Sequence, residues 1–232
     1  MNIPIIYEDE DLLIADKPAG IDVIDLGKML SEKYSELKGI ERNGIIHRLD
    51  KNTSGLILIA KNEGALIFFQ KQFINRNIEK RYSALVVGRV EGDRGVIEAL
   101  IGRSPKDRTR QKVYLPFEPK AQDQRDALTE YKVLKRLKSE KEEDYTLIEA
   151  FPKTGRKHQI RVHLAYIHHP IAKDDVYGFK GQPCPDGLSR QFLHAGFIKV
   201  KMRNGEIKEF TSDLPEDLKI ARSKLYEQDT GI

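Results

Sequence analysis

Short strand-like segments recur along this chain of 232 residues, and helical patterns are few. Strands that follow one another in sequence, with helices inserted between groups of them, indicate an α+β fold with a mixed, mostly antiparallel central sheet and flanking helices. Runs rich in β-branched and aromatic residues predict the strands at 4–7, 12–17, 55–60, 81–87, 96–100, 128–137, 145–150, 192–202 and 207–211.

Two segments have the spacing of amphipathic helices. The first is expected to begin after an N-cap at Asp25 and to end before Gly39, with an apolar stripe of Leu26, Leu30, Tyr34 and Leu37. Asn62 is the expected N-cap of the second, whose buried face is Ala65, Leu66, Phe69 and Phe73. Both helices should pack against the sheet.

Composition excludes several classes of protein. Hydrophobic residues make up 39% of the chain and charged residues 33%, which argues against a disordered chain. The longest apolar runs, such as 56–60, are far shorter than the roughly 20 residues of a membrane span. The first residues lack the pattern of a secretory signal, and Cys184 is the only cysteine, so we expect a cytoplasmic protein without disulfides.

The chain shows no internal repeat, low-complexity block or linker, so we expect one catalytic domain over residues 1–232. Basic residues cluster in the segment 103–112, RSPKDRTRQK, which is too polar for a core. The segment could follow a phosphate backbone, although a solvated loop is an equally good interpretation of such a run.

The strongest chemical signal is the polar stretch 44–55, GIIHRLDKNTSG, between two apolar segments. Asp50 lies close to Thr53, Ser54 and Gly55, whose hydroxyls and turn amides could orient its carboxylate as a nucleophile. An Asp that merely forms a turn before the next strand would give the same local pattern.

The stretch 44–62, GIIHRLDKNTSGLILIAKN, resembles the signature H-R-L-D-x-x-T-S-G of the RluA-like RNA pseudouridine synthases. Four more blocks continue this resemblance in order: IIYEDEDLLIADKPAGIDV, EKRYSALVVG, PKTGRKHQIRVHLAYIHHPI and RQFLHAGFIKV. It runs from about Ile5 to about Leu218 and implies a pseudouridine synthase fold. Many members carry a small RNA-binding domain before the catalytic one, and we expect none here.

The resemblance also implies residue roles. The family's catalytic aspartate falls on Asp50, its active-site tyrosine on Tyr82 and its active-site arginine on Arg161. An arginine in contact with Asp50 would keep that carboxylate ionised and oriented. Ile160 is expected to help wall the base pocket, and Arg48 to fill the gap left by an extruded nucleotide.

RNA is the implied partner, either ribosomal or transfer RNA. Extruding a base costs a few kcal/mol and stacking on an aromatic ring returns about 1–3 kcal/mol, so phosphate contacts must supply the remainder. The candidates are Arg103, Lys106, Arg108, Arg110, Arg156 and Lys157. We expect no membrane association, no obligate protein partner and a monomer.

No cofactor is implied, and the spacing of His158 and His163 is poor for a metal site on a helix. The family usually has Gly-Asp where this chain has Lys173-Asp174, and His-Pro where it has Met202-Arg203. We expect neither departure to touch the three catalytic residues.

Pseudouridine formation breaks the bond from ribose C1′ to base N1 and makes one from C1′ to C5. A carboxylate could add to C1′, add to base C6, or support a glycal, and the sequence does not distinguish these routes. Two rival functions are an RNA-binding module without activity and a hydrolase that cleaves the glycosidic bond, which normally needs two carboxylates.

Overall fold

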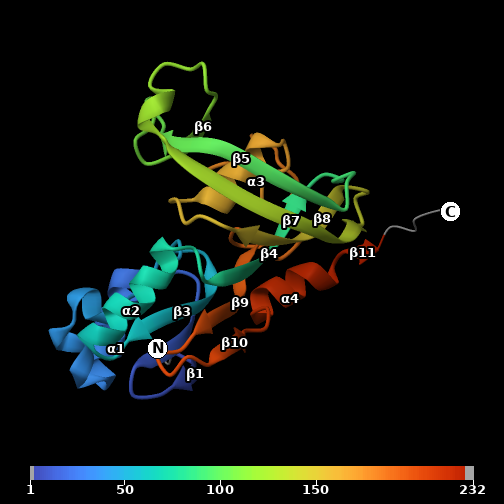
Figure 1. The fold of residues 1–232 in the computed structure, drawn as a ribbon. Coiled ribbons are helices and arrows are strands. Elements are labelled where there is room, and N and C mark those ends of the chain that lie inside the picture. Colours follow the sequence, from blue (N-terminus) through green and yellow to red (C-terminus); the bar gives the residue numbers. More distant parts are fainter. Residues whose placement is uncertain (1–2, 228–232) are drawn as a thin grey trace. The chain divides into compact units, whose positions relative to one another are not determined.

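The structure, a computed structural model, describes residues 3–227 and divides into two compact units (Figure 1). Among the described residues, the first unit contains 3–81 and 194–213, and the second contains 82–193 and 214–227. Each unit has its own strands and its own helices, so each is described by itself.

The first unit is built on strands of which β3 is buried throughout and β2 is largely buried. β1 (Ile5–Glu8), β2 (Leu12–Lys17) and β3 (Ser54–Ala60) pair in antiparallel order. β3 is buried along its whole length, as expected for a strand covered on both faces. It meets β9 (Leu193–Lys201) in a short parallel pairing, and β10 (Ile207–Thr211) runs antiparallel to β9.

The two predicted helices belong to this unit, with one error of boundary. α2 (Glu63–Ile74) begins after Asn62, whose side chain accepts the Ala65 amide, as predicted. α1 (Val23–Lys33) is capped by Asp22 and not by Asp25, because the Asp22 carboxylate accepts the amides of Ile24 and Asp25. It also ends early, and the chain continues in the 3₁₀ turns η1 (Ser35–Gly39) and η2 (Glu41–Gly44).

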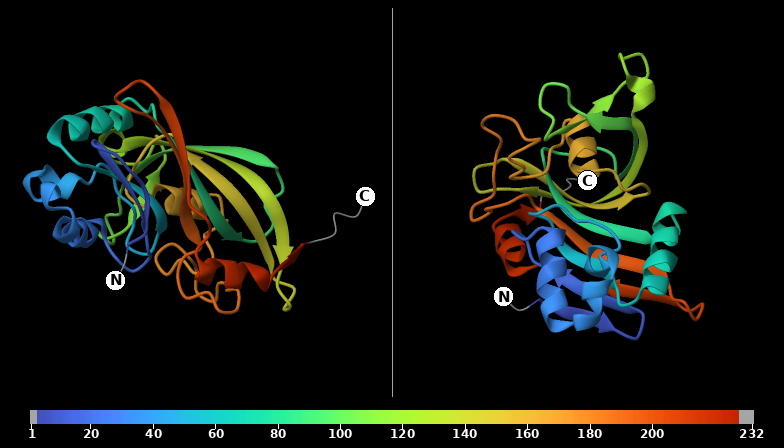
Figure 2. Two further views of the ribbon diagram at one scale, coloured as in Figure 1. Left: turned by 90° about the horizontal axis from the view of Figure 1, so that it is seen from below. Right: turned by 90° about the vertical axis from the view of Figure 1, so that its left-hand side faces the viewer.

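The second unit is an antiparallel sheet in the order β4 (Glu79–Val87), β8 (Asp144–Pro152), β7 (Arg125–Lys138), β5 (Arg94–Arg103) and β6 (Gln111–Tyr114). The two-residue β11 (Tyr226–Glu227) adds to β7. α3 (Gln159–Tyr166) packs against β5, β6, β7 and β8 on one face of this curved sheet (Figure 2). The other elements of the unit are the 3₁₀ turn η3 (Ala121–Asp123) and the helix α4 (Glu216–Ser223).

The sheets and helices confirm the predicted α+β class, and every predicted strand is present to within a few residues. The elements without a prediction are β6, β11, α3 and α4, which are short or polar. Within residues 3–227, the longest helix is too short, and the helices too polar, to cross a membrane.

Candidate active site and RNA-binding residues

In the first unit, the loop that carries Asp50 is held in place by a buried lysine. Lys17 is fully buried at the end of β2. Its ammonium donates to the carbonyls of Pro18, Ile21 and Lys51 at 2.8, 2.8 and 3.0 Å. Within the loop, the Thr53 amide donates to the Asp50 carbonyl at 3.0 Å. The backbone at Asp50 and directly after it is therefore fixed, while Asp50 stays partly exposed.

The loop ends in a close backbone approach between β3 and β9. Gly55 has a φ of +117°, and a Cβ there would lie 2.3 Å from the Ala195 carbonyl oxygen, so only glycine fits. His194 lies 3.1 Å from the Ser212 carbonyl, to which its Nε2 must donate. Its Nδ1 therefore accepts from the Ser54 hydroxyl at 3.0 Å. These contacts anchor the segment that follows the loop.

The other end of the loop is anchored by His47. Its Nε2 accepts the Leu58 amide at 3.1 Å, and its ring stacks on Phe73 at 4.7 Å between centroids. Burial, and to a smaller extent the charge of Lys80, lowers the pKa of His47 to about 3, so the ring is neutral. Arg48, next in the chain, is exposed.

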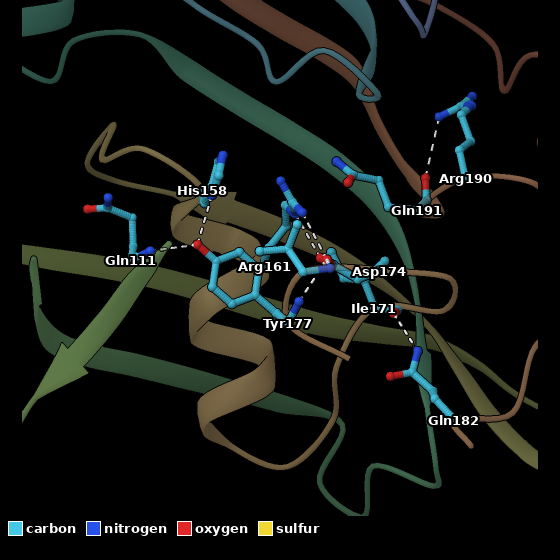
Figure 3. Close-up of polar contacts among 10 residues, drawn as sticks. Gln111, His158, Arg161, Ile171, Asp174, Tyr177, Gln182, Arg190 and Gln191 are labelled. Atoms are coloured by element: carbon cyan, nitrogen blue, oxygen red, sulfur yellow. Dashed lines mark hydrogen bonds and ion pairs between the residues drawn. The ribbon is translucent and has the colours of Figure 1, made fainter. Parts of the chain in front are cut away.

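In the second unit, Arg161 forms a buried ion pair on α3. Its Nε and Nη2 donate to the two carboxylate oxygens of Asp174 at 2.7 and 2.8 Å (Figure 3). Both side chains are buried, with exposed fractions of 6% and 0%. Burial by itself would raise the pKa of Asp174, but the bonds from Arg161 and from the backbone amides of Val176 and Tyr177 hold it below its usual value.

Tyr177 links this ion pair to the basic segment. Its hydroxyl accepts the Gln111 amide at 2.9 Å and lies 2.8 Å from His158 Nδ1 (Figure 3). The guanidinium carbons of Arg161 and Arg110 lie 5.1 and 5.5 Å from the centre of its ring, within cation–π range. The tyrosine therefore brings together two arginines that lie far apart in the sequence.

The remaining predicted residues are distributed around this group and elsewhere in the second unit. Lys157 donates to the Thr109 carbonyl at 3.3 Å, and Arg156 to the Asp126 carbonyl at 2.9 Å. The predicted phosphate ligands Arg103, Lys106 and Arg108 are exposed, whereas Ile160 and Tyr82 are buried. The predicted pairing of Arg161 with Asp50 joins residues of different units and stays a prediction.

The departure from the family pattern at 173–174 lies at Lys173, because Asp174 is also the residue that is usual in the family. Asp174, the second residue of the Lys173-Asp174 pair, contacts the predicted catalytic residue Arg161 directly. Lys173 has a φ of +59°, the left-handed region in which glycine is at no disadvantage. This accounts for the glycine that the family usually has at that position.

Three residues with clear positioning roles were not singled out from the sequence, namely Lys17, Tyr177 and His194, and Asp174 was named only as part of the Lys173-Asp174 pair. The local sequence pattern does not identify the partner of any of these residues. Lys17 and His194 do lie within blocks of the family resemblance, which is a signal that could have found them. In residues 3–227, no cluster of three or more His, Cys, Asp or Glu side chains could hold a metal ion.

Comparison with known proteins shows the family of the chain. The family model described as RNA pseudouridylate synthase matches residues 11–166, most of the chain. The chain belongs to this family. The resemblance to its RluA-like branch is confirmed by similar proteins that carry the name of ribosomal large subunit pseudouridine synthase D. The protein is thus an RNA pseudouridine synthase, an isomerase of uridine in RNA.

Two relatives and one solved structure illustrate the similarity of this pseudouridine synthase to known proteins. An uncharacterized RNA pseudouridine synthase, YlyB, of Bacillus subtilis is 38% identical over 94% of the chain and 71% of its own length. Ribosomal large subunit pseudouridine synthase D of Nitrosomonas europaea is 38% identical over 93% of the chain and 63% of its own length. Human RNA Pseudouridylate Synthase Domain Containing 1 matches 98% of the chain and 89% of its own, at 25% identity and a TM-score of 0.80.

Proposed function

We propose that this pseudouridine synthase isomerises one specific uridine in a structured RNA, with Asp50 as the nucleophile and the target base flipped out of its stack. The observation that supports Asp50 is the fixed backbone around it. Lys17 holds the carbonyl of the next residue, and the Thr53 amide holds the carbonyl of Asp50 itself. A fixed loop holds the backbone of Asp50 in place before the substrate binds, which lowers the cost of reaching the reacting geometry.

The other predicted residues have complementary roles in this proposal. Tyr82 stacks on the flipped uracil, Ile160 forms part of the pocket wall, and Arg48 occupies the vacated place in the RNA stack. Arg161 orients the Asp50 carboxylate, while Asp174 fixes the plane of the guanidinium by its bidentate bond. Arg103, Arg108, Arg110, Arg156 and Lys157 contact RNA phosphates.

The reaction is balanced without an external reagent. The bond from C1′ to N1 breaks, the uracil turns, and C5 bonds to C1′, while C5 loses a proton to solvent and N1 takes up one from solvent. Asp50 assists by adding to C1′, by adding to C6, or by supporting a glycal after C2′ loses a proton. In each route the carboxylate is regenerated, so no cofactor is consumed.

For the target we favour ribosomal RNA over transfer RNA, because similar proteins are named ribosomal large subunit pseudouridine synthase D. We also propose that the protein acts as a monomer in the cytoplasm. The RNA backbone would then supply most of the contact area, and the basic segment 103–112 would contribute to the choice of target.

The test is the release of tritium from RNA labelled with [5-³H]uridine by the wild type, by Asp50→Asn and by the control Asp25→Asn, an exposed carboxylate on α1. We expect release by the wild type and the control only, because the amide that replaces the Asp50 carboxylate cannot act as a nucleophile. Activity of Asp50→Asn close to that of the wild type would reject the proposed nucleophile. Free uracil among the products would identify a hydrolase instead.

A further inference from the structure

Lys80, at the start of β4, differs from the other lysines of the chain that are at least half-buried. Within residues 3–227, its ammonium has neither a hydrogen-bond partner nor a carboxylate partner. Every other lysine of this kind donates to a carbonyl, a carboxylate or a hydroxyl: Lys17, Lys61, Lys112, Lys138, Lys157, Lys173, Lys199 and Lys208. A cation taken partly out of water without a counter-charge is unfavourable, so this arrangement needs a reason.

The groups around Lys80 supply no negative charge. Its Nζ lies 5.7 Å from the centre of the Phe73 ring on α2. The ionisable group that faces it from the loop is His47, which is neutral because its pKa is about 3. Glu79, the neighbour on its own strand, pairs with Arg81 at 2.7 Å. Burial lowers the pKa of Lys80 to about 8, so at neutral pH most molecules carry an ammonium whose charge is unpaired.

The surroundings also indicate where a counter-charge would come from. Lys80 is only partly buried as a residue. It interacts with His47, which immediately precedes Arg48 in the loop of Asp50. In sequence it stands two residues before Tyr82. Lys80 therefore lies on the strand that carries Tyr82 and interacts with the loop that carries Arg48 and Asp50. These are three of the residues proposed to act on the target nucleotide.

We propose that Lys80 binds a phosphodiester group of the substrate RNA beside the target uridine, and that the RNA supplies the missing counter-charge. This inference rests on the proposed function. A lysine is a suitable ligand, because its ammonium acts as a compact point charge toward a phosphate oxygen. In the complex, a phosphate oxygen then forms an ion pair with the Lys80 ammonium.

The first test measures RNA affinity against salt, with in vitro transcribed large-subunit ribosomal RNA as the probe. Each neutralised phosphate contributes about 0.7–0.9 to the slope of log K against log salt concentration. Lys80→Met should reduce the magnitude of the slope by that amount, whereas Lys80→Arg should keep it. The control is Lys71→Met, which removes an equal charge from an exposed lysine on α2 and should leave the slope unchanged.

The second test measures the pH dependence of RNA affinity. A purely structural role of Lys80 would contribute nothing to this dependence. A group with a pKa near 8 that must be charged to bind causes roughly a tenfold loss of affinity between pH 7 and pH 9. The wild type and Lys71→Met should show this loss. Lys80→Arg, whose side chain stays charged, and Lys80→Met, which has no charge to lose, should both lack it.

The inference is overturned if Lys80→Met keeps the slope and the pH dependence of the wild type. Failure of the proposed function looks different: the wild type would release no tritium, while the effects of Lys80 on RNA affinity would persist. A wild type that does not bind the transcript at about 50 mM salt would contradict both proposals.

Discussion

At the scale of single residues, the buried pair of Arg161 and Asp174 is the feature with the largest energetic consequence. Asp174 accepts two bonds from the guanidinium and two from backbone amides, at Val176 and Tyr177. Removing one partner of a buried pair costs more than the pair itself contributes, because the other charge stays in the interior. The neighbouring pair of Lys173 and Asp175 keeps 37% and 71% of its side-chain surfaces exposed and should contribute little.

We therefore expect Asp174→Asn to lower the free energy of unfolding by about 3–5 kcal/mol. The control Asp175→Asn, one position further along the chain, should change it by less than about 1 kcal/mol. Urea denaturation of the three proteins measures both values. Equal effects of the two substitutions would show that burial of the pair does not matter.

The same pair predicts a pH dependence of stability. The pKa of Asp174 is lower in the folded protein than in the unfolded chain, where it is about 3.9. Its contribution is therefore complete above pH values near 4 and is lost as the pH falls through the lower folded value. Denaturation curves should show a constant gap between wild type and Asp174→Asn from about pH 7 to pH 5, and a shrinking gap below about pH 4. A gap that stays constant down to about pH 2 would contradict the assigned ionisation.

At the scale of elements, the Tyr177 hydroxyl joins three segments of the second unit. Its partners are the first residue of β6 and the residue before α3, and its own backbone amide donates to Asp174. β6 has four residues, follows the loop 104–110, and pairs on one side with β5. The position of the basic segment 103–112 thus depends on a residue more than 60 positions away.

Tyr177→Phe should loosen the start of β6 while leaving the rest of the sheet intact. The Gln111 amide would lose its acceptor, at a cost of about 1 kcal/mol. Hydrogen exchange at that amide should become faster by roughly fivefold, while amides of β7 and β8 keep their rates. Tyr226→Phe, which removes an exposed hydroxyl bonded to Glu142, is the matched control. Unchanged exchange at Gln111 would mean that another group holds the strand.

At the scale of the whole molecule, the attraction of RNA depends more on where the charges lie than on the net charge. The net charge is only +4. Many cations are already paired with carboxylates, such as Lys61 with Glu8 and Arg190 with Asp217. A polyanion is therefore attracted mainly by exposed cations, such as Arg108 in the loop after β5.

Arg108→Gln should reduce the magnitude of the salt dependence of RNA binding by about 0.7–0.9 in log–log slope. Lys219→Gln changes the net charge equally, at an exposed position on α4, and should leave the slope as it is. The affinities are measured between about 50 and 200 mM salt. If both variants shift the slope alike, RNA responds to total charge and not to the basic segment.

Local sequence determined those features whose physical cause is local. The strands were predictable because β-branched and aromatic runs suit a pleated, half-buried surface, and α2 because Asn62 bonds to an amide three residues ahead. The fold class follows from the order of these local elements along the chain. The family follows from the order of the sequence blocks that resemble it. The N-cap of α1 was misplaced because Asp22 and Asp25 are both suitable, and only the backbone conformation at Asp22 decides between them.

Tertiary structure alone decided which side chains hold the candidate site in place. Lys17 reaches a carbonyl 34 positions away, Gln111 donates to Tyr177 across 66 positions, and Ser54 meets His194 across 140. No periodicity or turn preference encodes such pairs, because their energy arises when folding removes both groups from water. The same reason applies to Lys80: its sequence neighbours look ordinary, and only the packed chain shows that its ammonium lies over the Phe73 ring with no hydrogen-bond or carboxylate partner among residues 3–227.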